Sequence, residues 1–376
     1  MSYVITAGGT GGHVSPALAV AAELQKLDKH VVFAGSTGGM EEALVREAGL
    51  EYRAFAAKGF NRQRPWTLLS SGVVLAQSTG RARRWLQELH ASVVGAFGGY
   101  VSVPVGRAAV REGIPLLIHE QNSHMGWANK HLSTHAEVIA LTYEAAADAL
   151  DASARAHVQL TGNPVRPEFA LLADEEHVTR LRRGFRQELG IAQDAVLLLV
   201  FGGSQGARHI NEAVVRHAPQ LMRLPGLTVL QLTGPREFAR VEAALAQEFG
   251  GSIPEAWQLM DYCNRMPEAL AAADLVLCRA GASSLAEVSA AGRPALLVPY
   301  PYATADHQRK NAESLVAAGA AHMLLDAELD SPQLLETLLT LIDDGEARSR
   351  MLEAATQQRN AGAARRVAEL LVGIAG

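Results

Sequence analysis

Two glycine-rich turns hold the residue types best suited to chemistry in this chain. The first is Gly8-Gly9-Thr10-Gly11-Gly12-His13, and the second is Gly202-Gly203-Ser204-Gln205-Gly206-Ala207-Arg208. Each follows a short apolar run and opens an Ala/Leu/Val-rich helical pattern. Glycines let backbone N–H groups approach a ligand closely, and the start of a helix carries partial positive charge. Both turns are therefore suited to a phosphate group or a sugar hydroxyl.

The first half of the chain also contains two sets of polar side chains that could take part in chemistry. His13 carries an imidazole, which titrates near neutrality and can take a proton from a sugar hydroxyl, although a histidine at a helix start can also simply cap or pack. The segment His119-Glu120-Gln121-Asn122 ends an apolar run from Pro115 to His119. That is the carboxyl edge of a strand, where open α/β sheets place ligands. The alternative for this segment is a solvated loop with a helix cap.

The second half contains two comparable segments. Residues Cys278 to Glu287 run from an apolar strand through a small-residue turn into a helix, so their amides can meet a diphosphate. Glu287, about one turn into that helix, can accept two ribose hydroxyls or can be a surface acid that favours the helix dipole. Residues Asp306 to Asn311 offer amide and carboxylate groups to sugar hydroxyls, and taken alone they would pass as an exposed loop.

Several common nucleotide-binding patterns are absent from the sequence. The Rossmann fingerprint fails because Val14 stands where the third glycine is needed, and no ribose-binding acid ends the apolar run from His30 to Gly35. Neither turn is followed by the Gly-Lys-Ser/Thr of a Walker A motif. No Asp-x-Asp and no metal-ligand spacing occur, so we expect no metal and no cofactor, and a leaving diphosphate would depend on helix N-termini and backbone amides.

Length and composition limit the number of domains and the class of protein. A length of 376 residues predicts about two domains, and 48% hydrophobic with 19% charged residues is ordinary for a soluble globular protein. A net charge of −5 argues against a general nucleic-acid binder. Two cysteines without close spacing exclude a disulfide scaffold and a cysteine-rich zinc site, which fits a reducing compartment. The N-terminus enters a strand directly with no secretory signal pattern, so we expect a cytoplasmic protein.

Alternating strand and helix patterns predict an α/β fold with parallel sheets in both halves. The expected strands are Tyr3–Ala7, His30–Gly35, Val93–Phe97, Pro115–His119, Glu137–Ala140, Val196–Phe201, Leu227–Leu232, Leu275–Cys278 and Ala295–Val298. Two prolines interrupt the pattern within Gly162 to Pro167, which is the expected hinge. We therefore expect domains at residues 1–163 and 164–345, with the last helical segment, 346–376, returning to the first domain.

One region combines apolar bulk with basic charge. No stretch has the roughly 20 uninterrupted apolar residues that cross a bilayer. Between residues 51 and 112, however, nine Lys/Arg accompany three acids in an acidic protein. This pattern is typical of a segment lying on an anionic membrane, although packing on the domain core explains the apolar residues equally well. The candidate membrane contacts are Trp66, Leu69, Val73, Arg81, Arg84 and Trp85.

Taken in order along the chain, the motifs resemble those of the MurG family of bacterial peptidoglycan glycosyltransferases. The matching segments are Gly8–His13, Gly98–Ser102, His119–Asn122, Gly162–Arg166, Gly202–Arg208, Ala282–Glu287 and Gln308–Ala312. The resemblance implies a GT-B fold of two Rossmann-like domains facing a central cleft, and an inverting transfer without metal. It also implies UDP-N-acetylglucosamine as donor and lipid I as acceptor, giving lipid II for cell wall synthesis. The expected location is peripheral, on the cytoplasmic face of the inner membrane, with cell-wall synthesis proteins as partners.

The resemblance also assigns roles to residues. His13 is the candidate base for the acceptor's 4-hydroxyl, with Glu120 behind it, and the backbone at Cys263 is placed against uracil. The expected donor site comprises Thr10, Gly11, Gly12, Asn122, Arg166, Ser204, Cys263, Ala282, Ser283, Ser284, Leu285, Ala286, Glu287 and Gln308. Two alternatives remain open from the residues alone: a UDP-N-acetylglucosamine epimerase with the same two-domain architecture, and a non-catalytic nucleotide-sugar sensor.

Overall fold

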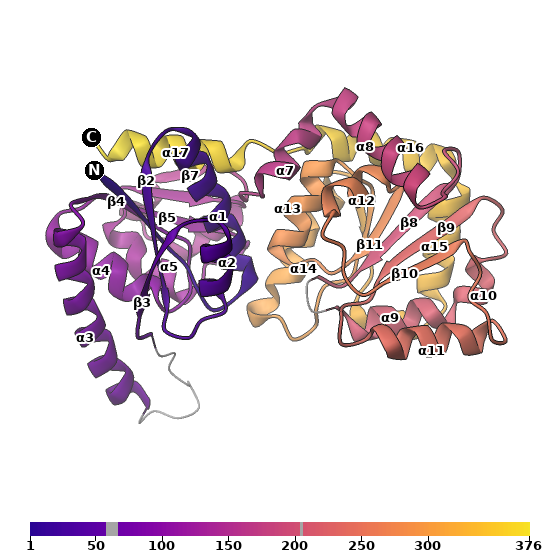
Figure 1. The fold of residues 1–376 in the computed structure, drawn as a ribbon, viewed down its shortest axis with the longest axis horizontal. Helices are drawn as coiled ribbons and strands as arrows, with labels where there is room; N and C mark the ends of the chain where they lie inside the picture. The colour runs from indigo at the N-terminus through magenta and orange to yellow at the C-terminus, as the bar shows by residue number, and fades with distance from the viewer. Residues whose placement is uncertain (58–66, 204–205) are drawn as a thin grey trace. The chain divides into compact units, whose positions relative to one another are not determined.

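The computed structural model describes residues 1–57, 67–203 and 206–376, with backbone alone for 67–71 and Thr304. The chain forms two compact units, residues 1–167 with 362–376, and residues 168–361 (Figure 1). The division lies four residues after the expected hinge boundary at 163. The expected returning segment, 346–376, is itself divided: α16 (Gly345–Gln357) belongs to the second unit, and α17 (Ala363–Ile374) belongs to the first.

The first unit is built on a seven-stranded sheet in the order β3-β2-β1-β4-β5-β6-β7, with every neighbouring pair parallel. Its inner strands are almost entirely buried because helices cover both faces. The strands are β1 (Ser2–Thr6), β2 (His30–Ser36), β3 (Glu51–Phe55), β4 (Ala91–Ala96), β5 (Leu116–Glu120), β6 (Val138–Leu141) and β7 (Val158–Leu160).

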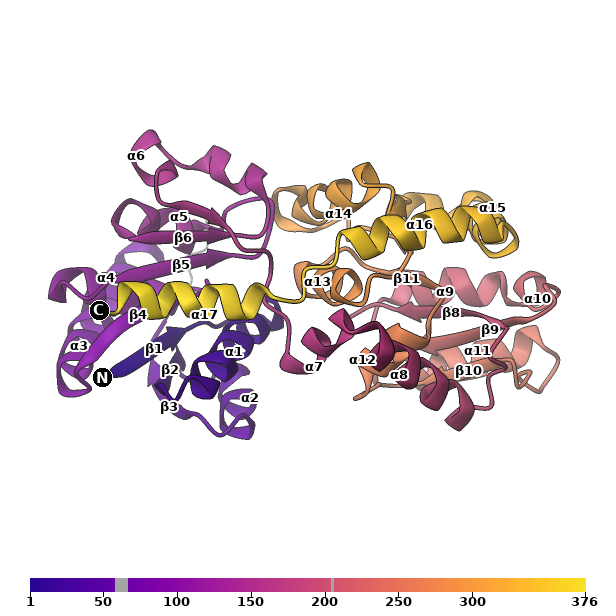
Figure 2. The same ribbon diagram turned by 90° about the horizontal axis from the view of Figure 1, so that it is seen from above.

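Separate cores form on the two faces of this sheet. On one face α3 and α4 pack through residues such as Leu86 and Val105. On the other, α1 and α17 pack through Val20 and Leu371, and α17 lies alongside α1 and β4 (Figure 2). The helices are α1 (Gly11–Lys26), α2 (Glu41–Glu47), α3 (Thr67–Glu88), α4 (Ser102–Glu112), α5 (Trp127–Leu132), α6 (Ala152–Arg155) and α17, with short turns η1 (Ser133–His135) and η2 (Glu144–Ala149).

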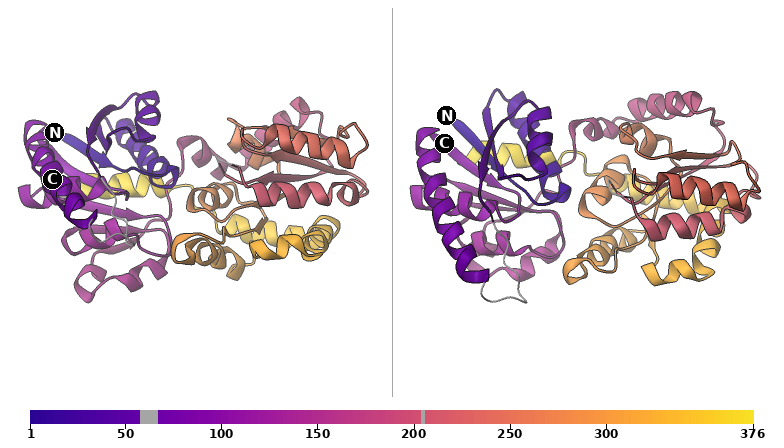
Figure 3. Two further views of the ribbon diagram at one scale, coloured as in Figure 1. Left: turned by 90° about the horizontal axis from the view of Figure 1, so that it is seen from below. Right: turned by 60° about the horizontal axis from the view of Figure 1, so that its bottom comes forward.

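The second unit repeats the scheme with six parallel strands in the order β10-β9-β8-β11-β12-β13. In each unit, the strands lie between helices on both faces (Figure 3). The strands are β8 (Val196–Phe201), β9 (Leu227–Leu232), β10 (Trp257–Met260), β11 (Leu275–Cys278), β12 (Ala295–Leu297) and β13 (Ala321–Met323).

One core of the second unit packs its sheet against α9, α11 and α15, and α12 joins α8 to β8. The helices are α7 (Pro167–Ala170, at the boundary), α8 (Glu175–Glu188), α9 (Arg208–Arg216), α10 (Ala218–Leu221), α11 (Phe238–Glu248), α12 (Met266–Ala272), α13 (Ala282–Ala291), α14 (His307–Ala317), α15 (Gln333–Asp343) and α16, with η3 (Leu171–Ala173), η4 (Thr304–Asp306) and η5 (Asp326–Asp330).

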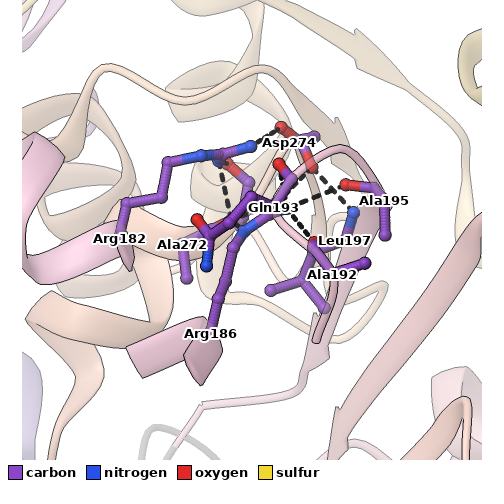
Figure 4. Close-up of polar contacts among 9 residues, drawn as sticks. Arg182, Arg186, Ala192, Gln193, Ala195, Leu197, Ala272 and Asp274 are labelled. Carbon is purple, nitrogen blue, oxygen red and sulfur yellow. Dashed lines mark hydrogen bonds and ion pairs between the residues drawn. The ribbon is translucent and has the colours of Figure 1, made fainter. Parts of the chain in front are cut away.

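A charged clamp closes the amino edge of this second sheet (Figure 4). Arg186 of α8 is fully buried and donates to the carbonyls of Ala272, Ala192, Gln193 and Ala195. Its other partner is Asp274, which also accepts from Arg182 at 2.6 Å and from the Leu197 N–H at 2.7 Å. The clamp therefore ties α8 to the amino ends of β8 and β11.

The expected α/β fold with two parallel sheets is confirmed, and every expected strand is present. The sequence missed four strands, β3, β7, β10 and β13, and these are the edge strands of the two sheets. Among the described helices, none is long and apolar enough to cross a membrane.

The turn after β4 depends on glycine, because its backbone packs directly on the first glycine turn. Gly99 has a φ of 82°, and a Cβ added there would lie 2.2 Å from the carbonyl oxygen of Gly8. We expect Gly99→Ala to lower the free energy of unfolding by about 2 kcal/mol or more, as measured by urea denaturation. Gly80→Ala in α3 is the control, since an added Cβ there meets nothing within 4 Å. Equal losses in the two variants would contradict the close packing of the turns.

Candidate active site

The first glycine turn leads from β1 into α1. Thr10 precedes the helix in an extended conformation, and Gly9 has a positive φ of 86°. The first turn of α1 contains no acidic residue, so its partial positive charge is not offset from within the helix. The helix start therefore favours a ligand that carries phosphate or hydroxyl oxygens.

His13 is held in one tautomer by this turn. Its Nδ1 lies 3.2 Å from the carbonyl oxygen of Gly8 and 3.1 Å from Oγ1 of Thr10. A carbonyl can only accept, so the proton lies on Nδ1, and Nε2 is the basic nitrogen. The ring covers Gly98, where an added Cβ would lie 2.8 Å from Cδ2 of His13. The turn after β4 thus fixes the orientation of the imidazole.

Glu120, at the end of β5, is occupied by its own loop. Oε1 accepts from the backbone N–H of Asn122 at 3.1 Å and from its side-chain amide at 3.3 Å. Oε2 accepts from the N–H of Gly126 and the amide of Asn129, each at 2.9 Å. Glu120 was expected behind His13, but these bonds direct its carboxylate toward residues 122–129. Asn129 has an ordering role that the sequence analysis did not identify.

His119, next to Glu120, is a structural histidine. Burial lowers its pKa to about 4, so the ring is neutral at physiological pH. Its Nε2 donates to the carbonyl of Gly162 at 3.0 Å, and Nδ1 accepts from Gln121. His119 therefore connects the end of β5 to the segment that contains Arg166, a partly exposed residue near the end of this unit's main segment.

In the second unit, three of the expected segments converge. A Cβ added at Gly206 would lie 2.1 Å from the carbonyl oxygen of Thr233, so the second glycine turn is packed against the end of β9. A Cβ added at Gly203 would lie 4.0 Å from Oγ of Ser284. One added at Gly281 would lie 3.8 Å from Nε2 of Gln308. Ser204, an expected donor contact, lies outside the described residues.

The start of α13 presents a mixed face. Ala282 and Leu285 are buried, whereas Ser284, Ala286 and Glu287 are partly exposed. The Ser283 hydroxyl is buried and has no hydrogen-bond partner within the described parts of the chain. No acid lies in the first turn of α13 or of α9. Both helix starts therefore retain their attraction for an anion.

The loop before α14 is held in an unusual conformation. Ala305 and Asp306 both have positive φ, 53° and 56°, which costs free energy in residues other than glycine and is concentrated at functional sites. Gln308 follows, and its Oε1 accepts from the N–H of Tyr300 at 2.9 Å. Tyr302 in the same loop is 83% exposed. This loop presents amide and aromatic groups beside the α13 turn.

Cys263, the position that the resemblance places against uracil, lies in the loop after β10. The side chain is buried, and burial raises the pKa of its thiol, so the thiol is protonated at neutral pH. Any contact from this position to a ligand would therefore come from its backbone. No group of His, Cys, Asp and Glu suited to a metal ion occurs among the described residues.

A charged network behind these turns was not identified from the sequence. His209 in the first turn of α9 lies 2.7 Å from Asp326 and 3.2 Å from Asp330. Asp326 also pairs with Arg279, which donates to the carbonyls of Val298 and Pro299. The network therefore connects the second glycine turn to the strand that precedes the Gln308 loop. Its residues are far apart in sequence, which is why no local motif marked them.

The candidate membrane contacts divide between surface and core. Val73 is 59% exposed, and Arg81 and Arg84 are exposed on α3. Trp85 is instead buried, with its ring centroid 5.3 Å from that of Phe55, so its placement at a membrane surface was wrong. The side chain of Leu69 and all of Trp66 lie outside the described residues.

Comparisons with known proteins agree along nearly the whole chain. The models of the glycosyltransferase family 28 N-terminal and C-terminal domains match residues 3–141 and 197–367. A UDP-N-acetylglucosamine–N-acetylmuramyl-(pentapeptide) pyrophosphoryl-undecaprenol N-acetylglucosamine transferase of Halothermothrix orenii is 38% identical over 94% of each chain. The crystal structure of Acinetobacter baumannii MurG covers 99% of each chain with a TM-score of 0.76 and 28% identity. The structure of a UDP-GlcNAc 2-epimerase from Neisseria meningitidis shares the fold, with a TM-score of 0.67. The match covers 99% of this chain and 100% of the epimerase chain, but the sequence identity is only 13%.

The network around His209 predicts a pH-dependent stability. Burial lowers the pKa of His209, but hydrogen bonds to Asp326 and Asp330 outweigh it and raise the pKa above its usual 6.5. The stabilisation is therefore complete below about pH 6.5 and is lost as the pH rises through the raised value. We expect His209→Gln to be less stable than wild type by about 1 kcal/mol at pH 6, and this difference to shrink toward pH 9 in urea denaturation.

His322→Gln, on the exposed residue of β13, controls for loss of an imidazole from this unit. A stability difference between wild type and His209→Gln that stayed constant with pH would contradict the charged pairing.

Proposed function

The chain belongs to glycosyltransferase family 28, and we propose that it transfers N-acetylglucosamine from UDP-N-acetylglucosamine to the 4-hydroxyl of N-acetylmuramic acid in lipid I. The product would be lipid II, the disaccharide-bearing precursor of peptidoglycan. The observation that carries this function is the match over nearly the full length to transferases of that name at 37–38% identity. The epimerase alternative has support only from the fold, at 13–14% identity.

The donor would be held mainly by the second unit. The starts of α9 and α13 carry no acid in their first turns, so their amides would stabilise the charge that grows on the departing diphosphate. Glu287 would accept the ribose hydroxyls, the Cys263 backbone would meet uracil, and Gln308 would bond a sugar hydroxyl. The remaining donor contacts are proposed at Ser204, Ala282, Ser283, Ser284, Leu285 and Ala286, and from the first unit at Thr10, Gly11, Gly12, Asn122 and Arg166.

His13 would act as the general base. Since Nδ1 carries the proton that is donated to Gly8, Nε2 can take the proton of the acceptor's 4-hydroxyl. The oxygen then bonds to the anomeric carbon from the face opposite UDP, the bond from that carbon to the diphosphate oxygen breaks, and the configuration inverts. The proton stays on the imidazole until solvent removes it. In this scheme Glu120 is a positioning residue, because its carboxylate orients Asn122.

The test is a transfer assay with a matched pair of variants. Purified protein is incubated with labelled UDP-N-acetylglucosamine and a lipid I analogue, and wild type is expected to form a disaccharide lipid. His13→Asn keeps a side-chain amide near the Nδ1 position, able to donate to Gly8, but lacks a base. We expect kcat to fall by about 10²- to 10⁴-fold, with donor affinity in calorimetry changed by less than about threefold.

His157→Asn, on an exposed histidine after α6 in the same unit, is the control and should keep normal turnover. Normal turnover in His13→Asn would remove His13 as the base but leave the transferase activity standing. An epimerised sugar nucleotide without a lipid product would overturn the proposed function.

We further propose that the first unit binds the anionic surface of the membrane that carries the acceptor. A pocket of about 530 Å³ beside α4 and α5 is lined largely by basic side chains. Burial is the largest cause that lowers the pKa of His131, and the charges of Arg107 and His135 lower it further, so these neighbours repel a positive charge on this ring. Phosphate headgroups would relieve this repulsion. The lining residues are Arg107, Val110, Arg111, Lys130, His131, Leu132, Thr134 and His135.

Charge reversal tests this surface. Arg107→Glu and Lys130→Glu are each expected to weaken sedimentation with phosphatidylglycerol vesicles by at least about fivefold, since each basic residue contributes roughly 1 kcal/mol near an anionic membrane. Wild type and all three variants should bind only weakly to neutral phosphatidylcholine vesicles. Arg350→Glu, on an exposed arginine of α16 in the other unit, is the control. Unchanged binding of the two pocket variants would place the membrane contact elsewhere.

A further inference from the structure

We propose that the second unit holds a phosphate-like oxyanion between Arg293 and Arg359, at the amino edge of its sheet. Arg293 lies just before β12, and Arg359 follows α16. The glycine turns and the α13 turn follow the carboxyl ends of β8 and β11, at the opposite edge. The site is therefore distinct from the proposed donor site and does not depend on the proposed function.

The first observation is a surplus of buried positive charge. The guanidinium groups of Arg182, Arg186 and Arg359 all repel Arg293, whereas Asp274 is the one carboxylate that attracts it among the described residues. That carboxylate is already engaged, because it accepts from Arg182, from Arg186 and from the N–H of Leu197 (Figure 4). Asp274 therefore serves the clamp and leaves Arg293 without a counter-ion of its own.

The second observation is that Arg293 is buried and unsatisfied. The residue is only 8% exposed, and its Nε has no hydrogen-bond partner in the described portion of the chain. Burial, followed by repulsion from Arg182, lowers its pKa to about 10, so it remains charged at neutral pH. A buried unpaired charge is strongly unfavourable, and native proteins normally pair it.

The third observation is a second unsatisfied donor on the adjacent side chain. Arg359 lies over Gly292, where an added Cβ would be 2.4 Å from its Nε, and this Nε also lacks a partner among the described residues. Gly292 ends α13 with a positive φ of 59°. The carboxyl end of that helix offers about half of one negative charge, which falls short of balancing two guanidinium groups.

Two neighbouring guanidinium groups, each with an unpartnered Nε among the described residues, are suited to a tetrahedral oxyanion. Arginine donates through a planar fork that matches phosphate oxygens, and such charge-assisted bonds are stronger than neutral ones. Arg359 is partly exposed, so an anion can reach the pair from solution. A bound phosphate would join the end of α16 to the start of β12.

The test measures the thermal unfolding midpoint of the full chain against inorganic phosphate. Chloride keeps the ionic strength constant, and saturating UDP is present throughout so that phosphate cannot act at a nucleotide site. Wild type is expected to show a saturable rise in midpoint, as any ligand of the native state produces. Arg293→Met, which keeps the length and apolar stem, is expected to lose this rise and to weaken the apparent phosphate affinity by at least tenfold.

Arg350→Met, which removes an exposed guanidinium from α16, should respond as wild type does. Should Arg293→Met fail to fold, Arg359→Met serves in its place because that side chain is partly exposed. No saturable rise in wild type, or an equal rise in the variant, would overturn the site. The kcat of sugar transfer should be unchanged in either variant, so failure of this proposal is separable from failure of the proposed function.

Discussion

In each unit, the glycine-rich turn of the candidate active site packs against a neighbouring backbone segment so closely that a side chain at the contacting glycine would not fit. An added Cβ at Gly99 would lie 2.2 Å from the Gly8 carbonyl oxygen, and one at Gly206 would lie 2.1 Å from that of Thr233. In each unit, a turn that follows one strand is thus pressed against the end of its neighbour. The contact in the first unit also places Gly98 under the ring of His13. Orientation of the candidate base is therefore a consequence of backbone packing.

Two histidines in the first unit illustrate how surroundings separate structural from chemical roles. His119 is fully buried, neutral through a pKa of about 4, and bonded through both nitrogens. His13 is partly exposed, and the carbonyl of Gly8 directs its basic nitrogen away from the turn. The sequence analysis named His13 as the candidate base and gave His119 only as part of the polar segment His119–Asn122. Burial and the identity of the acceptor distinguish them.

The interior strands of both sheets could be predicted from the sequence, and the edge strands could not. Interior strand Val196–Phe201 is almost entirely buried and forms a continuous apolar run. Edge strand Glu51–Phe55 is largely exposed, so its sequence resembles a loop. The sequence was also ambiguous about the surroundings of Trp85. An amphipathic helix with arginines on one face fits a membrane or a core equally well, and here Ala82, Trp85 and Leu86 face the core while Arg81 and Arg84 face outward.

Long-range charge pairing accounts for what the motifs did not reveal. His209 and Asp326 are 117 residues apart, and Arg293 and Arg359 lie in different loops, so no local spacing connects them. In the two proposals, the two edges of the second sheet attract anions by different means. At the carboxyl edge, neutral amides at helix starts suit a diphosphate that must depart after reaction. At the amino edge, the full charge of the buried Arg293 suits an anion that stays, because removing it would leave that charge unpaired. The net charge of −5 for the whole chain gives no sign of a preference for anions at either edge.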